Sequence, residues 1–364
     1  MGIVPLSGLI VQRNEIMKSN KWVRGWLLAG LVMIFFQIVL GGITRLTGSG
    51  LSITKWDIVF GSIPPLTTED WQIAFDMYKQ TPQFAKVNSL MDLEAFKMIY
   101  FWEYIHRLWA RLMGFVFIIP FLFFLFKGWF TPLLKKQLLI VFLLAVLVAS
   151  FGWIMVASGL INRPWVNAYK LSFHLILAVI LYGYLLWTFL SYSVTDFSVN
   201  ASQRLSRFIG IFFTVVFIQI YVGGVMSGMK AGMYFPTWPD MNGAFLPDYL
   251  WMGKNWTWDN FVHYDQDRFM PGWVQFIHRL LAYMVALMGL LGIYFFHKDQ
   301  NMKIRLWMLL TFFVVLLQVL LGISTVVGSK GMTPVNLGVL HQMGAMGVFT
   351  CALVLFYYTK RSKI

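Results

Sequence analysis

Four histidines lie near the same end of four long apolar segments. They form two pairs along the chain, His106 with His174 and His278 with His341. The pairs belong to a repeat, because Tyr-Ile-His-Arg-Leu at 104–108 matches Phe-Ile-His-Arg-Leu at 276–280. Neutral imidazole is a common axial ligand of heme iron, and two helices that carry histidines at matched depth can hold one planar ring between them. The sequence therefore predicts two heme sites, one in each copy of the repeat.

A single histidine at a helix end often bonds a nearby carbonyl group, and this is the alternative for each of the four. Their arrangement in two matched pairs favours ligation over that alternative. The other two histidines, His263 and His297, have no counterpart in the other copy, so we expect them to be structural or solvated. Two histidines on one iron leave no coordination site for oxygen, which favours electron transfer.

The residues beside the histidines make the two pairs unequal. Glu103 lies three residues before His106 and shares its helix face, whereas Gln275 holds the matching position in the second copy. A carboxylate at the membrane edge beside a heme ligand is a functional-site candidate; the alternative is a helix-start glutamate favoured by the helix dipole. One pair therefore suits a reaction and the other the handling of electrons. Arg107 and Arg279 follow the histidines, and their guanidinium groups suit heme propionates or lipid headgroups.

The elements that position these residues are expected to be membrane-spanning helices. Of the 364 residues, 59% are hydrophobic and only 12% are charged, whereas a soluble protein has about 25% charged residues. Several apolar runs approach the roughly 20 residues that a spanning helix needs. There are eight of them, near 26–45, 106–126, 138–159, 171–190, 208–228, 277–296, 306–327 and 337–358.

The repeat divides the chain into two halves of four spans each. A Gln-x-x-x-Gly phrase occurs at Gln37–Gly41, Gln219–Gly223 and Gln318–Gly322. The third span has Gly152 at the equivalent place but Val148 instead of glutamine. Small residues let helices approach each other or a flat cofactor edge. Because each half has an even number of spans, we expect parallel repeats related by an axis along the membrane normal. The predicted fold is an all-α integral membrane protein, with eight transmembrane helices in two tandem parallel four-helix bundles (1–190 and 191–364) related by pseudo-two-fold symmetry.

The distribution of charge predicts the orientation in the membrane. Both termini lie on one side together with the segments 127–137, 191–207 and 297–305, and that side holds 15 of the 29 Lys and Arg but 3 of the 15 Asp and Glu. The positive-inside rule makes this side cytoplasmic and puts all four histidines near the outer leaflet. The net charge of +14 is then mostly a topology signal, and no nucleic-acid partner is expected.

Two long outer loops interrupt the helical pattern. The first, 46–105, contains two amphipathic stretches, 67–79 and 88–103, that predict short interfacial helices. The second, 229–276, is rich in tryptophan, which suits either an interfacial aromatic belt or a lid over the outer hemes. Its tryptophans are Trp238, Trp251, Trp256, Trp258 and Trp273. The one cysteine, Cys351, falls in the last span; it is expected to serve packing, and no disulfide or thiolate cluster is expected.

At these residues the sequence strongly resembles the heme A synthase family in its mitochondrial and proteobacterial form. The matching phrases are Gly42-Ile-Thr-Arg-Leu-Thr-Gly-Ser-Gly-Leu-Ser52, Phe101-Trp-Glu-Tyr-Ile-His-Arg107, Gly152-Trp-Ile-Met-Val-Ala-Ser-Gly-Leu160, Ala231-Gly-Met233, Pro239-Asp-Met-Asn-Gly243, Gln275-Phe-Ile-His-Arg279 and His341-Gln342. They occur in the family's order over nearly the whole chain and leave only the segment 1–20 uncovered, so the resemblance does not rest on one short motif.

The resemblance implies that the protein oxidises heme O to heme A, converting a ring methyl to a formyl group by successive oxidations. It implies that His106 and His174 hold the substrate heme in the N-terminal half. It also implies that His278 and His341 hold a heme b cofactor in the C-terminal half, and that Glu103 assists the chemistry. Some family members carry a cysteine pair in the first outer loop, which this chain lacks. That difference argues against a thiol-dependent step as a general mechanism.

The resemblance also implies a location and partners. The expected location is the inner (cytoplasmic) membrane, where heme A would be made for terminal oxidases. Candidate partners are heme O synthase, cytochrome oxidase assembly factors and an electron donor or acceptor that the sequence does not identify; a homo-oligomer is left open.

Functions of two other classes stay as alternatives. One is a two-heme b-type electron carrier without its own chemistry, which suits symmetric histidine pairs but gives no reason for Glu103 opposite Gln275. The other is a transporter with histidines along its path, which predicts interrupted helices and polar residues near the membrane middle, whereas the polar features here lie at the outer ends.

Overall fold

Eight long helices form the body of the protein in the computed structural model, which describes residues 20–54, 63–159, 163–194, 201–297 and 301–361. They are α2 (Lys21–Leu46), α5 (Leu93–Phe126), α6 (Pro132–Gly159), α7 (Ala168–Ser193), α8 (Gln203–Gly228), α11 (Phe269–Phe296), α12 (Met302–Val327) and α13 (Val335–Arg361). Each expected span lies inside one of them, and all eight are long and apolar enough to cross a membrane. The chain is therefore a multi-pass, all-α membrane protein. The basic segment 1–19, part of the orientation argument, lies outside the described residues.

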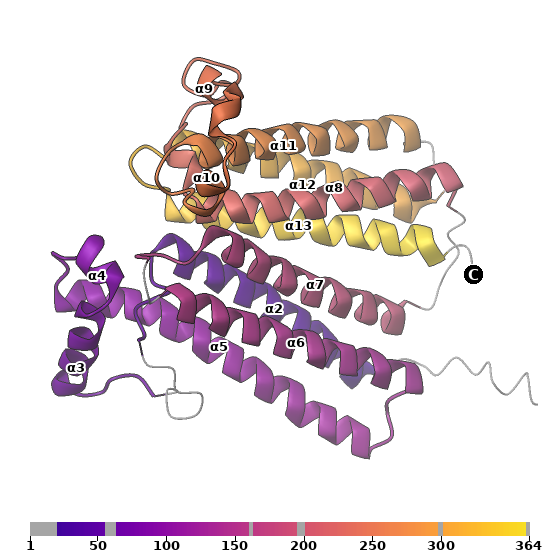
Figure 1. Cartoon of the computed structure of the whole chain (residues 1–364). Helices are drawn as coiled ribbons and strands as arrows, with labels where there is room; N and C mark the ends of the chain where they lie inside the picture. Colours follow the sequence, from indigo (N-terminus) through magenta and orange to yellow (C-terminus); the bar gives the residue numbers. More distant parts are fainter. Residues whose placement is uncertain (1–19, 55–62, 160–162, 195–200, 298–300, 362–364) are drawn as a thin grey trace, which may run out of the picture.

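The long helices fall into two groups (Figure 1). Helices α2, α5, α6 and α7 form the first group, and α8, α11, α12 and α13 form the second. Across the boundary α7 packs against α8, and α2 packs against α13. This grouping is compatible with the two tandem four-helix units that the repeat predicts, which stay a prediction. The pseudo-two-fold relation between them and the domain limits 1–190 and 191–364 stay predictions.

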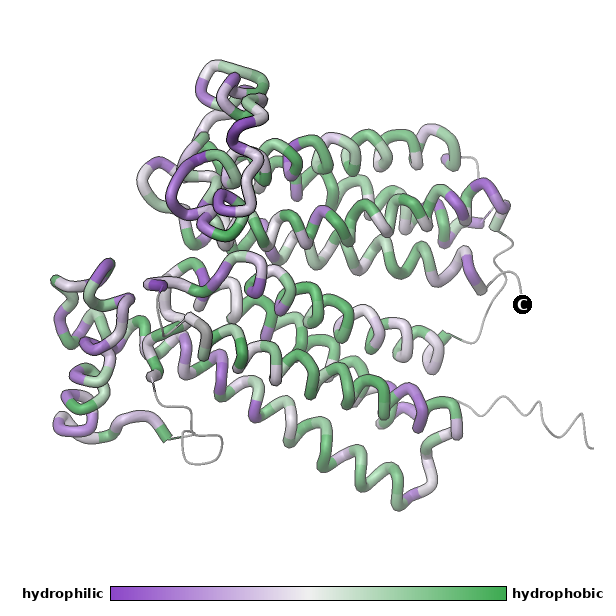
Figure 2. The backbone as a smooth tube through the Cα atoms, viewed as in Figure 1, coloured by the Kyte–Doolittle hydropathy of each residue, from purple (hydrophilic) through white to green (hydrophobic). Residues whose placement is uncertain are grey.

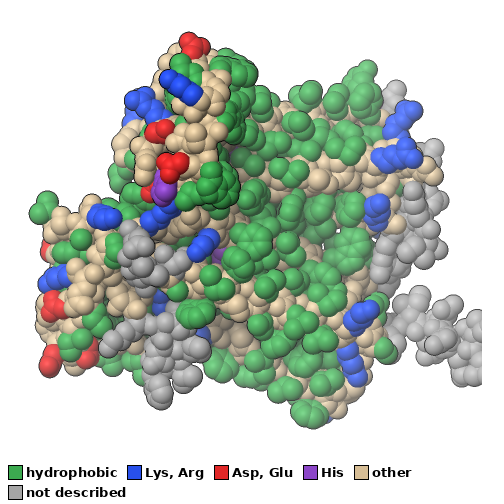
Figure 3. Space-filling view, in the orientation of Figure 1, with side chains coloured by type: hydrophobic (Ala, Val, Ile, Leu, Met, Phe, Trp, Pro, Cys, Tyr) green, Lys and Arg blue, Asp and Glu red, His purple; other side chains and the backbone are tan. Residues whose placement is uncertain are grey.

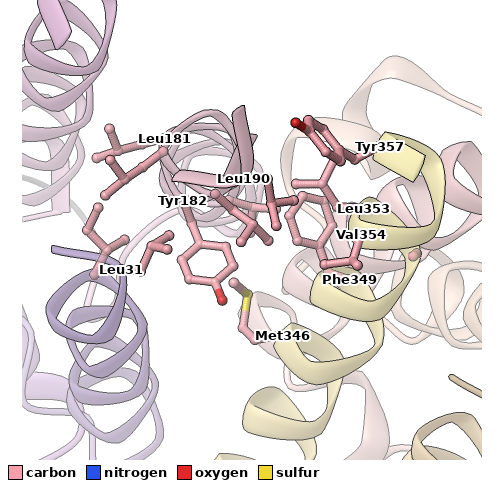
Figure 4. Packing of buried hydrophobic residues seen from close by; sticks show 14 of the residues in the cluster. Leu31, Leu181, Tyr182, Leu190, Met346, Phe349, Leu353, Val354 and Tyr357 are labelled. Atoms are coloured by element: carbon pink, nitrogen blue, oxygen red, sulfur yellow. The ribbon is translucent and has the colours of Figure 1, made fainter. Parts of the chain in front are cut away.

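The largest buried core lies where the two groups meet. Leu31 of α2, Tyr182 of α7 and Phe349 of α13 are buried in one cluster (Figure 4). The Tyr182 hydroxyl also lies 3.0 Å from Thr350 Oγ1 of α13. Within a bilayer such contacts stabilise the fold mainly through close van der Waals packing, because lipid tails are as apolar as the side chains. The contact holds the two groups against each other.

The surface divides into an apolar middle and charged ends. Hydrophobic residues dominate the long helices (Figure 2), and hydrophobic side chains cover most of the visible face of the helical body (Figure 3). Lys and Arg side chains lie at both ends of the visible face, whereas the visible acidic side chains lie only at the end away from the C-terminus. Large exposed side chains on the long helices, such as Phe115 and Phe313, are suited to face lipid.

Two folded loops stand at the end of the body away from the C-terminus (Figure 1). The first contains α3 (Thr68–Lys79) and α4 (Pro82–Lys86), and α3 confirms the short helix expected over 67–79. The second contains four short helical segments: η3 (Ala231–Met233), α9 (Asp248–Trp251), η4 (Gly253–Asn255) and α10 (Trp258–Val262). Both long loops therefore lie on the same side of the molecule.

The separate interfacial helix expected over 88–103 is wrong. The Asp92 side chain caps the N-terminus of α5 by accepting a hydrogen bond of 2.8 Å from Ala95 N, and the helix continues for 34 residues to Phe126. Neither glycine nor proline interrupts 93–106, so nothing in this stretch ends a helix. The amphipathic pattern belongs to the first turns of a spanning helix. His106 consequently lies well inside α5, although the apolar run alone suggests a position at its start.

Candidate heme-binding sites

The second histidine pair meets between α11 and α13. The ring centroids of His278 and His341 are 6.3 Å apart, with an angle of 78° between the ring planes. Because an imidazole nitrogen binds a transition metal at about 2 Å, two rings on opposite sides of one metal ion have centroids about 6 Å apart. The observed separation fits two axial ligands of one iron.

The first pair meets between α5 and α7. His106 and His174 lie near each other, and both residues are half-buried. The structure thus brings together each pair that the sequence predicts, and each pair joins the second and the fourth long helix of its half.

Every one of the four imidazoles packs against a glycine of a neighbouring helix. A Cβ built on the glycine would lie 3.1 Å or less from the ring Cε1 atom in all four cases. The pairs are Gly41 with His106, Gly152 with His174, Gly223 with His278 and Gly322 with His341. These are the glycines of the repeated phrase. Their role in the structure is to let a helix backbone approach the ring, because any side chain there would collide with it.

Three of the imidazoles also lie beside the glutamine of that phrase. The Nε2 atoms of Gln37, Gln219 and Gln318 are 3.3, 3.5 and 3.5 Å from Nε2 of His106, His278 and His341, respectively. His174 has no such neighbour, because Val148 replaces the glutamine. Sequence reasoning treated these glutamines as markers of the repeat and missed their contact with the histidines. The spacing of one helical turn between Gln and Gly was the available signal.

The polar atoms left over at both sites fit a heme. All four histidines have a buried Nδ1, and the three glutamines a buried Oε1, without a hydrogen-bond partner. Buried polar atoms are nearly always satisfied in native proteins, so such a cluster marks a place where a ligand or water belongs. Among the described residues, no group of three or more His, Cys, Asp or Glu side chains could hold a metal ion. Two protein ligands suffice for heme iron, because the macrocycle supplies the remaining nitrogen ligands.

Glu103 is fully engaged by the first outer loop. Its side chain is 2% exposed, and Oε2 accepts hydrogen bonds from Ser52 N (2.8 Å), Ser52 Oγ (2.7 Å) and Ile53 N (2.9 Å). The Arg107 guanidinium donates to Oε1 of the same carboxylate. These contacts satisfy the hydrogen-bonding capacity of both carboxyl oxygens. The carboxylate therefore anchors the loop at residues 52–53 beside the helix turn that carries His106, a contact that the sequence does not reveal.

In the second half, the residue that matches Glu103 donates a hydrogen bond to the outer loop, whereas Glu103 accepts hydrogen bonds from its loop. Gln275, which is buried, donates from Nε2 to Phe235 O at 2.9 Å. The Arg279 guanidinium, 8% exposed, donates to four loop carbonyls. These belong to Phe235 (3.3 Å), Thr237 (2.6 Å), Pro239 (3.2 Å) and Asp240 (2.6 Å). In this structure Arg107 binds Glu103 and the loop carbonyl of Ile53, and Arg279 binds loop carbonyls. Their predicted role as propionate contacts stays a prediction.

The remaining candidates have local roles. His263 lies 2.8 Å from Asp259 Oδ1 and His297 2.9 Å from Tyr294 O, and both are exposed, as expected for structural or solvated histidines. Cys351 is buried and free. In the tryptophan-rich loop, Trp273 packs against Trp251 and Trp256 and donates to Leu250 O at 3.0 Å. The loop is thus a folded cap at the end of α11 that carries His278.

The fold and the sites define a class: a polytopic helical membrane protein with two half-buried histidine pairs suited to heme. Comparison with known proteins narrows this class. The family model described as COX15-CtaA, cytochrome oxidase assembly protein, matches residues 24–353. The chain belongs to this family.

Curated relatives carry a more specific name. A protein of Nitrosospira multiformis named heme A synthase is 38% identical over 97% of this chain and 98% of its own length. Proteins of the same name from Bradyrhizobium diazoefficiens and Rhodopseudomonas palustris are 37% and 39% identical, over 91% and 90% of this chain and 90% and 86% of their own lengths. The resemblance that the motifs indicate is confirmed.

Proposed function

We propose that the protein is a heme A synthase, an oxidoreductase that converts the ring methyl of heme O to the formyl group of heme A. The observation that carries this proposal is the duplication of a histidine pair with buried Nδ1 atoms, in which a glycine of a neighbouring helix contacts each of the four rings. The family membership supports the same reaction, because full-length relatives bear that name.

We assign the two sites different tasks. His106 and His174 would hold the substrate heme, and His278 and His341 would hold heme b. When bound, heme b would supply one-electron transfer. The assignment is supported by the unequal neighbours of the pairs: the carboxyl group of Glu103 near His106 and the amide of Gln275 near His278. A fixed negative charge stabilises positive charge that develops nearby during oxidation.

The chain's own residues would orient the rings and exclude water. The glycine contacts fix the positions of the imidazoles, and the glutamines restrict ring rotation in three of the four sites. Glu103 holds residues 52–53 over the first site, and Arg279 holds residues 235–240 over the second. We retain Glu103 as the proposed catalytic residue, acting as a fixed anion in reach of the bound substrate, and Arg107 and Arg279 as proposed propionate contacts.

Location and partners follow from the proposed reaction. The enzyme would lie in the inner membrane with both termini in the cytoplasm and the heme sites near the outer leaflet. It would receive heme O from heme O synthase and pass heme A to cytochrome oxidase assembly factors. An electron donor or acceptor completes the reaction, and a homo-oligomer is compatible with the proposal.

Extraction of pigments from the purified protein tests the proposal. Heme O and heme A beside heme b are the expected result. Heme b alone would favour a two-heme electron carrier, and a preparation without heme would favour a transporter. Addition of heme O to membranes that contain the protein should produce heme A. If no heme A forms after reconstitution with a reductant and oxygen, the proposal is contradicted.

A further inference from the structure

The two halves differ at the place where their second and third long helices meet. In the second half α11 and α12 pack against each other, whereas in the first half α5 and α6 hardly touch. The other neighbouring pairs, α2 with α5 and α6 with α7, are closely packed. The first bundle therefore has one open side, and the second bundle has none of this kind.

The repeat register gives the cause of this difference. Gly289 and Gly292 of α11 receive side chains of α12, because a Cβ on Gly289 would lie 3.9 Å from Val315 and one on Gly292 would lie 2.6 Å from Met308. With His106 aligned to His278, the matching residues of α5 are Phe117 and Pro120. A bulky ring and a proline that distorts the helix replace two glycines, so α6 cannot approach α5 in the same way.

One stripe of α6 is left exposed as a result, and α5 contacts it at Phe142. Phe142, Ala145, Ala149 and Trp153 are exposed. With Gly152 aligned to Gly322, their counterparts in α12 are Phe312, Val315, Val319 and Ile323, which are all buried or half-buried. Val315 is 2% exposed, for example, whereas Trp153 is 51% exposed. The stripe is thus the face that would meet α5 if the first half closed as the second does.

The exposed stripe is continuous with the first histidine pair. Gly152, which contacts the ring of His174, lies next to Trp153 and three residues from Ala149. Farther along the helices, the rings of Phe117 and Phe142 stack at 6.4 Å and join α5 to α6. We name the space between α5 and α6 on the histidine side of this stack the α5–α6 opening. It lies between the surface suited to face lipid and the site where His106 and His174 leave buried nitrogens without partners.

We propose that the α5–α6 opening receives the long isoprenoid side chain of the substrate heme and is the route by which that heme enters from the bilayer. This inference rests on the proposed function. Heme O carries such a chain, and heme b does not. An apolar chain of this length is stable in lipid and costly to expose to water. A half that exchanges its heme in every turnover needs an open side, and a half that keeps its heme does not.

A bulky residue at Ala149 tests the inference. In protein that retains heme b in the second half, the first site of Ala149→Phe is titrated with heme O and separately with heme b, which has the same ring without the isoprenoid chain. We expect heme O to bind at least about tenfold more weakly, since loss of burial of about two methylene groups has that effect, while heme b binds to the first site as in the parent. Val146→Phe is the matched control, because Val146 and its counterpart Leu316 are both 47% exposed.

A second variant avoids the question of folding. Ala149→Cys is purified first and then labelled with a bulky maleimide, with Val146→Cys as control; Cys351 is 5% exposed and protected. Selective loss of heme O binding after labelling at position 149 supports the inference. Equal loss for both hemes, or no loss for either, overturns it. Failure of the unmodified parent to bind or convert heme O would instead contradict the proposed function.

Discussion

Gly322 of α12 lies directly against the imidazole of His341 on α13, where a Cβ would be only 2.8 Å from the ring Cε1 atom. The same relation recurs at the other three histidines. The backbone of one helix therefore serves as a wall for the ring carried by its neighbour. Small volume changes in a protein interior displace neighbouring groups. The orientation of each proposed histidine ligand therefore depends on a glycine that is not itself a ligand.

Gly322→Ala should weaken the second site. The added methyl group forces His341 to move, and overpacking of this kind costs about 1–3 kcal/mol, which corresponds to roughly a 5- to 100-fold loss of heme b affinity. The heme b content of the purified protein and its absorbance spectrum measure the effect. Gly114→Ala in α5 is the control, since nothing lies within 4 Å of its added Cβ and alanine favours a helix by about 0.5–1 kcal/mol. Unchanged heme b content in Gly322→Ala would show that the cradle has no effect.

His278→Ala and His341→Ala should each remove the low-turnover heme b. Loss of one axial nitrogen leaves the iron with a single protein ligand and opens a cavity beside it. Heme extraction after purification measures retained heme b. His263→Ala is the control, because His263 is exposed and lies in the outer loop at the C-terminal end of α10. His106→Ala and His174→Ala should keep heme b but lose bound substrate. Full retention of heme b in both second-half variants would contradict its assignment to this pair.

Arg279→Gln should release the segment 235–240 from α11. Hydrogen bonds from a charged donor contribute about 1.5–3 kcal/mol each, and Arg279 makes four such contacts with loop carbonyls. We expect faster amide hydrogen exchange over 235–240 and faster loss of heme b. Arg268→Gln, an exposed residue at the start of the same helix, should change neither. Parent-like exchange in Arg279→Gln would mean that the loop is held by other contacts.

The sequence predicted the eight spans and the pairing of the histidines because both depend on patterns that repeat within the chain. The apolar runs define the spans by composition, and the match of 104–108 with 276–280 fixes which histidines share a depth. The α5 boundary was misjudged because the apolar run begins later than the helix does, and the charged residues Glu94 and Lys97 lie in its first turns.

The contacts of the outer loops could not be predicted in the same way. Ser52 and Glu103 are 51 residues apart, and Arg279 reaches carbonyls about 40 residues away. Backbone groups have no signature in the sequence, so the partner of a buried arginine or glutamate that binds them stays hidden. The α5–α6 opening could not be predicted for another reason. It has no motif of its own, because it arises where Phe117 and Pro120 keep α6 from packing closely against α5.

Substitution of Glu103 tests whether the first histidine site is the one at which the substrate heme is oxidised. Glu103→Ala should keep the substrate heme bound through His106 and His174 but stop heme A formation, because the fixed anion is lost. Glu103→Gln should keep the loop partly in place but lose the charge that pairs with Arg107. Ser52→Ala removes only the donor hydroxyl at 2.7 Å, an effect of about 1–3 kcal/mol on loop stability. If Glu103 acts by charge, turnover should fall about 100-fold or more in Glu103→Gln and much less in Ser52→Ala. If both variants fall equally, the carboxylate serves to position the loop. Normal heme A yield in Glu103→Ala would return the residue to a structural role.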